Sequence, residues 1–307
     1  MRCPAPHLRQ ELAEEDGFAL LAVVGFLLVV TTLVSGFTLA ARSSLDLASD
    51  RFAEERLDLL ADGLVTVTGR TLARVGQGET VPAFALDASP AACRAGDLSI
   101  LVRVQDQHGL VDLNAAEAEL LDVALRSLGL SAAVARKHAD AILAYRTAET
   151  DSVAASALSS LLLLDDFSGA PFAAVEELYA FAALKDLSPL RLTQTFTVQS
   201  RQAQIAGPHM PAGLATVLPR QPTPLRPFIT ADAPAATTFR IEVSVRGGEG
   251  TLGFSERVLA VEDGRLRSLE RRIAPARQME RAPAAIATSC ETLFGAGATA
   301  HLRGLSA

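Results

Sequence analysis

The sequence predicts an α+β fold in which a long N-terminal helix packs on a small antiparallel sheet, with a large α-helical domain inserted into the sheet domain. Three observations carry this prediction. Residues 18–41 form an apolar run without charge or proline, strand patterns occur near residue 100 and again at 239–273, and residues 113–227 between them show helical patterns. The two groups of strands can share one sheet only if the middle segment is an insertion.

The N-terminal run is long enough to cross a membrane. As a helix, roughly 24 residues at 1.5 Å each span about 36 Å, against a hydrocarbon core of about 30 Å. A cleavable secretory signal is disfavoured, because its apolar core is shorter and needs small residues before the cleavage point, where Leu39 precedes Ala40 and Ala41. A buried core helix seldom lacks every charge over this length. An ordinary signal anchor is the main alternative.

The helix is predicted to continue beyond residue 41 in amphipathic form and to end near Gly76 and Gly78. Apolar residues recur at helical spacing, while acidic residues occupy the other faces. Such a helix needs a surface on which to bury its apolar face, and the sheet supplies one. The apolar positions are Leu45, Phe52, Leu59, Leu60, Leu64 and Val67.

Four segments predict the strands of the sheet. Residues 98–104 form the first, and residues 239–246 alternate between apolar and polar side chains, which is typical of a half-buried strand. Residues 254–261 and 265–273 follow. The Asp-Gly pair at 263–264 between these last two favours a type I′ hairpin turn.

Several short helices are predicted in the insertion. Asn114 followed by Glu117 resembles a capping box that opens a helix through residue 125, and Ser131 is expected to cap a second helix over 132–145. Further expectations are a buried apolar segment at 161–164, a helix opened by Pro171, a short helix at Ser188 and Pro189, and another at 212–218. The tail after Pro275 is expected to be loosely held, apart from whatever Cys290 fastens.

The net charge and the cysteine content limit the partners and the cellular compartment that the chain is expected to have. The formal net charge of −7 argues against a nucleic-acid partner, because nucleic-acid phosphates would be repelled. Cys3 precedes the apolar run, which leaves Cys93 and Cys290 as an even pair. A disulfide between them is predicted for a domain in an oxidising compartment, and two unrelated buried thiols are the alternative.

Catalytic motifs of known spacing are not found in the sequence, which lacks the G-x-S-x-G, H-E-x-x-H, P-loop and Rossmann patterns. The five histidines are scattered without metal-ligand spacing. His108 is interpreted as a turn residue and His138 as an exposed helix residue. Asp106 and Asp112 are interpreted as local caps. The chain is therefore predicted not to be an enzyme, and an extracytoplasmic hydrolase is disfavoured.

Several segments, in a shared order, resemble the minor pseudopilin K family of the bacterial type II secretion system. The order is a polar leader ending at Gly17 before Phe18, a membrane-length helix, the segment 104–116 and a later segment at 171–178. In that family a strand leads into an Asp-x-x-Gly-x-x-x-Leu-Asn-x-Ala motif, which opens a helical domain inserted in a pseudopilin sheet. The matching residues here are Asp106, Gly109, Leu113, Asn114 and Ala116.

The resemblance covers most of residues 17–273 and implies a pseudopilin fold. Prepilin peptidase is expected to cleave between Gly17 and Phe18, followed by methylation, although the leader departs from the usual basic pattern by carrying three acids at 14–16. The implied segments are a prepilin leader (1–17), a transmembrane helix (18–41), the rest of the helix with the first strands (42–112), the inserted α-helical domain (113–227), the closing strands (228–275) and a tail (276–307).

Ala22 stands at the fifth position of the mature chain, where most pilin-like subunits place a glutamate thought to pair with the amino terminus of the preceding subunit. The K family similarly has an uncharged residue there. A carboxylate in lipid is costly without a cation, so a subunit with no neighbour above it has no use for one. The resemblance therefore implies a position at the tip of a filament, and the plainer interpretation is drift at an unimportant site.

Relatives also carry an aspartate-rich loop linked with calcium. Calcium takes six to eight oxygen ligands, several of them from carboxylates, and the dense acidic spacing is missing here. No cofactor is required by this interpretation, and solvated surface acids are favoured over a calcium site. The residues that could contribute to such a site are Glu149, Asp151, Asp165 and Asp166.

The resemblance implies a single-pass protein of the bacterial inner membrane with its main domain in the periplasm. It would join other minor pseudopilins through its N-terminal helix and sheet, with prepilin peptidase and secreted exoproteins as further partners. The flanking arginines mildly favour the opposite orientation, because two precede the apolar run and three follow it within fifteen residues. The alternative is a signal-anchored periplasmic binding or scaffold protein outside any filament.

Overall fold

The structure is a computed structural model that describes residues 8–75, 84–147, 160–163, 170–219, 227–231, 237–247, 250–272 and 286–305. The chain divides into two units, Met1–Glu55 and Arg56–Ala307. In its described part the first unit is entirely helical. The second unit holds the sheet, the inserted helices and two C-terminal helices.

Helix α1 (Leu8–Val75) is one continuous helix that ends where the sequence predicted, just before Gly76. No proline interrupts residues 8–75, so the backbone hydrogen-bond ladder can run unbroken. Within the apolar run, the Thr31 and Thr38 hydroxyls donate to the carbonyls of Leu27 and Val34 at 2.8 and 3.0 Å. These polar side chains are therefore satisfied inside the helix, as an apolar environment requires.

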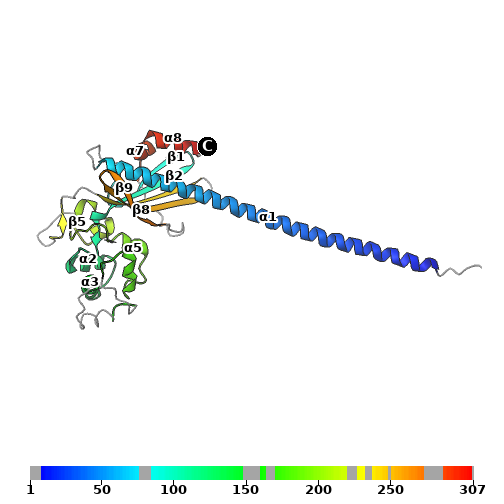
Figure 1. The fold of residues 1–307 in the computed structure, drawn as a ribbon, viewed down its shortest axis with the longest axis horizontal. Coiled ribbons are helices and arrows are strands. Elements are labelled where there is room, and N and C mark those ends of the chain that lie inside the picture. Colours follow the sequence, from blue (N-terminus) through cyan, green and yellow to red (C-terminus); the bar gives the residue numbers. More distant parts are fainter. Residues whose placement is uncertain are drawn as a thin grey trace, which may run out of the picture. The chain divides into compact units, whose positions relative to one another are not determined.

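A six-stranded sheet in the order β10-β1-β2-β7-β8-β9 forms the centre of the second unit (Figure 1). All neighbours are antiparallel except β1 and β10, which are parallel. β2 pairs directly with β7, with Ile100 opposite Val245, although the whole helical segment lies between them in the chain. The strands are β1 (Ala91–Ala95), β2 (Leu98–Asp106), β7 (Thr238–Arg246), β8 (Leu252–Glu262), β9 (Arg265–Arg272) and β10 (Ile286–Ala287).

The hairpin between β8 and β9 has the predicted turn. Asp263 and Gly264 both have positive φ, 51° and 73°, as a type I′ turn requires. The strand predicted at 239–246 is present as β7, but it is not half-buried, because Arg240 and Ser244 on the supposed open face are 9% and 5% exposed. Arg240 reaches the insertion instead, and its Nη1 donates to the carbonyl of Thr193 at 2.7 Å.

The second half of α1 packs on the sheet through one apolar face. The approach is close, because a Cβ added to Gly253 on β8 would lie 2.2 Å from the carbonyl carbon of Leu57. Only glycine fits at that crossing. The helix residues buried in the sheet core are Leu57, Ala61, Leu64, Val65 and Leu72.

From residue 286 onward, the tail is more ordered than the sequence predicted, which expected order only around Cys290. It adds β10 to the sheet and then forms α7 (Cys290–Phe294) and α8 (Ala296–Leu305). Ser289 caps α7 by accepting from the N–H of Glu291. A disulfide joins Cys290 to Cys93 on β1, with an S–S distance of 2.02 Å.

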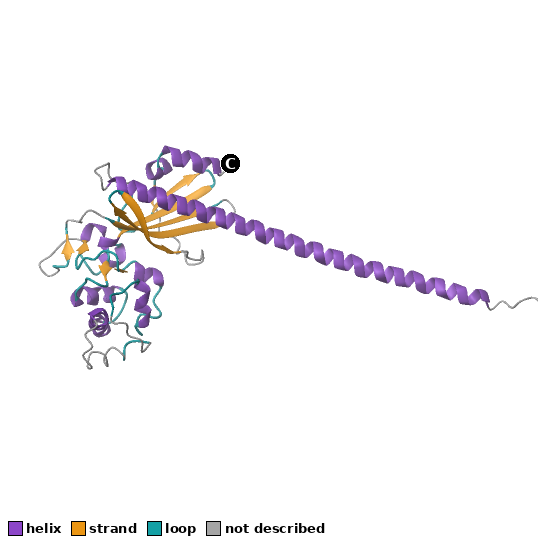
Figure 2. Cartoon of the chain, viewed as in Figure 1, coloured by secondary structure: helices purple, strands orange, loops and turns teal. Residues whose placement is uncertain are grey.

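The inserted residues form a second apolar core, and the helices that surround it are grouped apart from the sheet (Figure 2). Leu121, Leu125, Ile142 and Phe181 are fully buried in this core. The elements are α2 (Ala118–Ser127), α3 (Ala132–Thr147), η2 (Val175–Ala180), α5 (Pro189–Thr193) and α6 (Ala212–Ala215), with two short parallel pairs, β3 (Val111–Asp112) with β4 (Phe196–Thr197) and β5 (Ile205–Ala206) with β6 (Ile229–Thr230).

Several local predictions in the insertion are wrong. α2 begins at Ala118, four residues after the supposed cap Asn114, and the segment after Pro171 is a 3₁₀ helix rather than an α-helix. His138 is 4% exposed and lies against Phe181, and Leu163 in the supposedly buried segment is 50% exposed. At Asn114 and His138, tertiary contacts with Phe172 and Phe181 outweighed the local pattern.

Candidate functional site

Between residues 20 and 41 of the first unit, exposed apolar side chains surround the whole helix. Phe26 is 68% exposed and Phe37 is 76% exposed, and the other large apolar side chains from 20 to 39 are exposed as well. Leu45 and Phe52, two turns apart on one face, are 70% and 72% exposed. Within the described residues, α1 is the one helix long and apolar enough to cross a membrane. Such a surface marks contact with lipid or with other apolar helices.

The predicted processing residues lie within α1. The backbone at Gly17 and Phe18 is helical, and the side chain of Phe18 lies outside the described part of the structure. Ala22, at the fifth position after the predicted cleavage point, is exposed on the helix surface.

Two aspartates join the second half of α1 to strand β8. A carboxylate oxygen of Asp58 accepts from the N–H of Phe254 at 2.8 Å. Asp62 accepts from the hydroxyl of Ser255 at 3.0 Å and forms an ion pair with Arg257. Some acidic residues of the amphipathic helix therefore contact the sheet and are not solvated.

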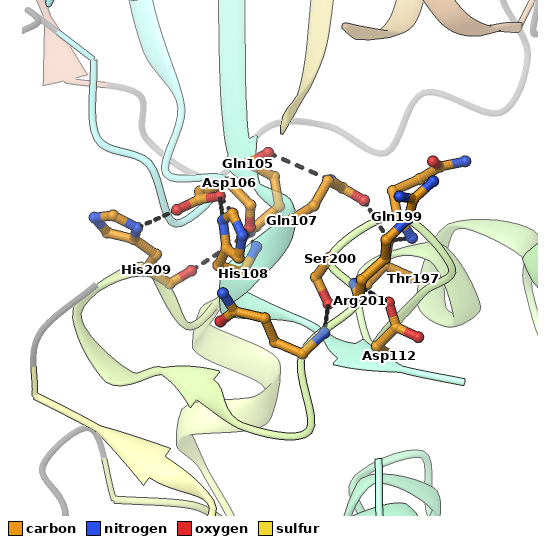
Figure 3. A network of polar contacts seen from close by, with 11 residues as sticks. Gln105, Asp106, Gln107, His108, Asp112, Thr197, Gln199, Ser200, Arg201 and His209 are labelled. Atoms are coloured by element: carbon orange, nitrogen blue, oxygen red, sulfur yellow. Dashed lines mark hydrogen bonds and ion pairs between the residues drawn. The ribbon is translucent and has the colours of Figure 1, made fainter. Parts of the chain in front are cut away.

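Asp106 lies at the centre of a buried polar network where β2 ends (Figure 3). Its Oδ1 lies 2.9 Å from Nδ1 of His108, and its Oδ2 lies 2.5 Å from Nδ1 of His209. Burial alone would raise the pKa of Asp106, but the hydrogen bonds from His108 and His209 outweigh it, so the pKa lies below its ordinary value. The charged carboxylate thereby joins the end of the sheet to the turn η3 (Gly207–His209) of the insertion.

The glycine of the sequence motif is required at this junction. A Cβ on Gly109 would lie 2.0 Å from the carbonyl oxygen of His209, which excludes any larger residue. The side-chain amide of Gln105 donates to the same carbonyl at 2.9 Å. Gln107 accepts from the Thr197 hydroxyl at 2.7 Å. Two segments that are far apart in sequence therefore pack here with their backbones in direct contact.

Asp112 forms a second centre of the network. Its Oδ1 caps the following turn by accepting from the N–H groups of Asn114 and Ala115, as the sequence predicted. Its Oδ2 accepts from the Ser200 hydroxyl at 3.0 Å and from the N–H of Arg201 at 2.7 Å. Arg201 has a positive φ of 54°, an uncommon backbone conformation that this contact stabilises.

Asn114 fastens two distant loops. Its side chain accepts from the N–H of Phe172 at 2.8 Å and donates to the carbonyl of Phe172 at 2.9 Å. The amide thus pairs with a backbone residue as a neighbouring strand would. Leu113 and Ala116, which complete the motif, are fully buried in the insert core.

The network is arranged to hold structure. The hydroxyls of Ser200 and Thr197 donate to Asp112 and Gln107, while both histidines contact Asp106. A hydrolase of the serine type would instead need a hydroxyl that faces a histidine. The motif first noticed in the sequence therefore belongs to a network that joins the sheet to the insertion. We call this network the polar junction; its residues are Gln105, Asp106, Gln107, His108, Gly109, Asp112, Thr197, Ser200, Arg201 and His209.

The candidate calcium ligands Glu149, Asp151, Asp165 and Asp166 lie outside the described residues. In the part of the chain that the structure describes, no group of three or more His, Cys, Asp or Glu side chains could hold a metal ion.

His209, Ser200 and Arg201 are among the members of the polar junction that sequence reasoning missed. They are separated from the aspartates that they contact by 103, 88 and 89 residues. The local signal near His209 was the Gly-Pro pair at 207–208, which indicates a turn but not its partner.

These features define a pseudopilin fold: a long apolar N-terminal helix, an antiparallel sheet on which its second half packs, and here a helical insertion between β2 and β7. A solved chain from the GspK–GspI–GspJ complex of the enterotoxigenic Escherichia coli type 2 secretion system is similar to this chain, with a TM-score of 0.51 and 12% sequence identity. The similarity covers 77% of this chain and 99% of the solved chain. No protein-family model and no curated protein matches the sequence.

Proposed function

We propose that the chain is a minor pseudopilin of a type II secretion system, in the position taken by the K family. The observation that carries the proposal is the pseudopilin fold with a helical domain inserted between two paired strands, together with its similarity to a chain of the GspK–GspI–GspJ complex. The exposed apolar surface of the first unit supports a role in helix packing.

In this proposal α1 anchors the protein in the inner membrane and the second unit lies in the periplasm. The disulfide between Cys93 and Cys290 supports that location, because such bonds persist in oxidising compartments and are rare in the cytosol. Other minor pseudopilins are the partners, and they contact the N-terminal helix and the sheet. The assembled tip promotes export of folded proteins across the outer membrane, and the chain itself performs no chemical step.

Ala22 supports a place at the tip. A subunit inside the filament gains from a glutamate that meets the amino terminus of its neighbour, whereas an unpaired carboxylate in lipid is destabilising. The uncharged residue at this position therefore suits the first subunit of the filament. The bulk of the insertion supports the same place, because a large added domain fits poorly inside a helical array.

Processing of the precursor tests the proposal. Expressed with an active prepilin peptidase, the chain should lose residues 1–17 and begin at a methylated Phe18, as measured by intact mass. Gly17→Val should block this shortening. Gly25→Val is the matched control, because Gly25 lies in the same helix and an added Cβ would meet no atom within 4 Å, and this variant should be processed normally.

A precursor that keeps Met1 in cells that process another pseudopilin would overturn the proposal. That outcome would favour a signal-anchored periplasmic protein, which is indifferent to substitution of Gly17.

A further inference from the structure

A basic groove of about 870 Å³ lies between the end of α1 and the β8–β9 hairpin. Four arginines line it, although the chain as a whole carries a net charge of −7. Arg70 and Arg74 come from the helix, Arg257 from β8 and Arg265 from β9. No aspartate or glutamate is among the lining residues.

Three of these arginines are available to a ligand. Arg70, Arg74 and Arg265 are exposed and have no ion pair or hydrogen-bond partner for their side chains among the described residues. Arg257 differs, because it pairs with Asp62. Uncompensated guanidinium groups gathered in one concave site favour carboxylate or phosphate ligands, which they can bind with two parallel hydrogen bonds.

The groove adjoins an open strand. β9 is the last strand in the sheet order, and within the described residues it pairs on one side only, with β8. Figure 1 shows β9 beside the final turns of α1. The free edge of such a strand presents backbone N–H and C=O groups to a further strand.

The groove also has apolar lining. Leu259 and Leu266 contribute to it, and they pack close to the helix, since a Cβ on Gly69 would lie 2.7 Å from Leu259 and 3.2 Å from Leu266. A polypeptide segment can use all three features at once: carboxylates on the arginines, backbone on the open edge and apolar side chains over the leucines. A lipid headgroup or free phosphate uses only the first.

We propose that the basic groove and the open edge of β9 bind an acidic, extended segment of a partner protein. The segment adds to the sheet as a strand next to β9, and its carboxylates pair with Arg70, Arg74 and Arg265. This interaction is separate from the packing of N-terminal helices, so it stands or falls independently of the position of the chain in a filament.

Binding of a designed peptide to the full-length protein in detergent tests the proposal. The probe is a fluorescein-labelled peptide of alternating Glu and Thr with the length of β9, 8 residues, and fluorescence anisotropy is the readout. Replacing Arg70, Arg74 and Arg265 together by Gln should weaken binding at least about tenfold. A matched triple variant at Arg94, Lys185 and Arg246, which removes the same charge from other exposed positions, should bind normally.

Two further probes separate the parts of the site. A peptide of alternating Lys and Thr should not bind, because its charge is reversed. An acidic peptide that is N-methylated at alternate residues keeps its charge but cannot pair fully as a strand, so its binding should also fall at least about tenfold. Raising the ionic strength should weaken binding of the acidic peptide to the unmodified protein. This test does not depend on whether any variant folds.

Three outcomes would overturn the proposal. The first is equal binding of the acidic peptide to the groove variant and to the control variant. The second is no peptide binding but arginine-dependent binding to vesicles with anionic lipid, which would make the groove a lipid site. The third is no peptide binding but self-association of the groove variant, which would show that the arginines only protect the open edge.

Discussion

The sheet core and the insert core of the second unit are stabilised in different ways. Five of the six strands form an antiparallel ladder that is closed by α1 and by a disulfide spanning 197 residues. In the insert, two short parallel strand pairs join distant segments. Single side chains that contact backbone add to them, such as Asn114 at Phe172 and Arg146, whose Nη1 donates to the carbonyl of Leu113 at 2.8 Å. The comparison teaches that two strands can pair in register with a helical domain between them in the chain, and that the polar junction and the hydrogen bond from Arg240 to Thr193 both join that domain to the sheet.

Removing the disulfide should have the largest effect on this comparison. Replacing Cys93 and Cys290 by Ser frees a loop of nearly two hundred residues in the unfolded chain, which should cost on the order of 3–5 kcal/mol. Hydrogen exchange measured by peptide should show the loss in β1, β2 and β7 before it appears in α2 and α3. Equal loss of protection in both cores would contradict the distinction.

Asp106→Asn should affect both cores, because it breaks the junction between them. It leaves two histidines facing an uncharged group in a buried site, which should cost about 3 kcal/mol of unfolding free energy. Chemical denaturation measures the loss of unfolding free energy. In a separate experiment, hydrogen exchange under native conditions should show faster exchange in the turn η3, because it is released from β2. Asp122→Asn is a suitable control, since among the described residues the side chain of Asp122 contacts the partly exposed Arg126 of its own helix and no residue of the sheet. If Asp106→Asn costs no more than this control, the junction is not what joins the cores.

Acid should weaken the same junction. The pKa of Asp106 is lowered in the folded chain, so its contribution to stability is present above its unfolded pKa of about 3.8 and is lost as the pH falls through the folded value. The unmodified protein should therefore lose more stability on acidification than Asp106→Asn, as measured by thermal unfolding from neutral to acidic pH. Parallel losses in the two proteins would contradict the assignment.

Asn114→Ala should affect only the insert. It removes two hydrogen bonds and leaves the backbone groups of Phe172 without those partners, which should cost about 2 kcal/mol. Exchange should increase around α2 and η2, with the sheet unchanged. Asn114→Asp keeps the acceptor but loses the donor, and an intermediate effect is expected. Faster exchange in β7 as well would contradict an effect that is confined to the insert.

Asp62→Ala should have the smallest effect, and it should fall on the sheet core. The ion pair with Arg257 is partly exposed, so the change should cost about 1 kcal/mol. Glu54→Ala is the control, because Glu54 is an exposed acid on the same helix. Thermal unfolding that does not distinguish the two variants would show that the contact of α1 with β8 depends on apolar packing alone.

The sequence allowed prediction of those elements whose causes are local. The length of α1 follows from a proline-free run that ends before Gly76, and the β8–β9 turn follows from Asp263 and Gly264. The insertion followed from two groups of strand patterns that had to share a sheet. Parity of the cysteines suggested the pair Cys93 and Cys290, which the structure joins.

Other predictions failed where distant contacts decide the outcome. Asn114 looked like a helix cap, but its amide is used by Phe172, 58 residues later. His138 looked exposed, because nothing in its own helix shows that Phe181 lies over it. The C-terminal helices were missed, since their apolar residues find a partner only when β1 is in place. The polar junction was visible as a motif, but its geometry depends on His209 and Ser200, which single-sequence patterns cannot bring to it.

The most direct test of the central claim is the native mass of the processed protein mixed in detergent with the other minor pseudopilins of the same cell. The account predicts one complex that contains a single copy of this chain, and it predicts weaker assembly when Leu45 and Phe52 on the exposed face of α1 are replaced by Glu, but not when Glu54 on another face is replaced by Gln. A chain that remains alone at every concentration, beside siblings that assemble without it, would contradict the account.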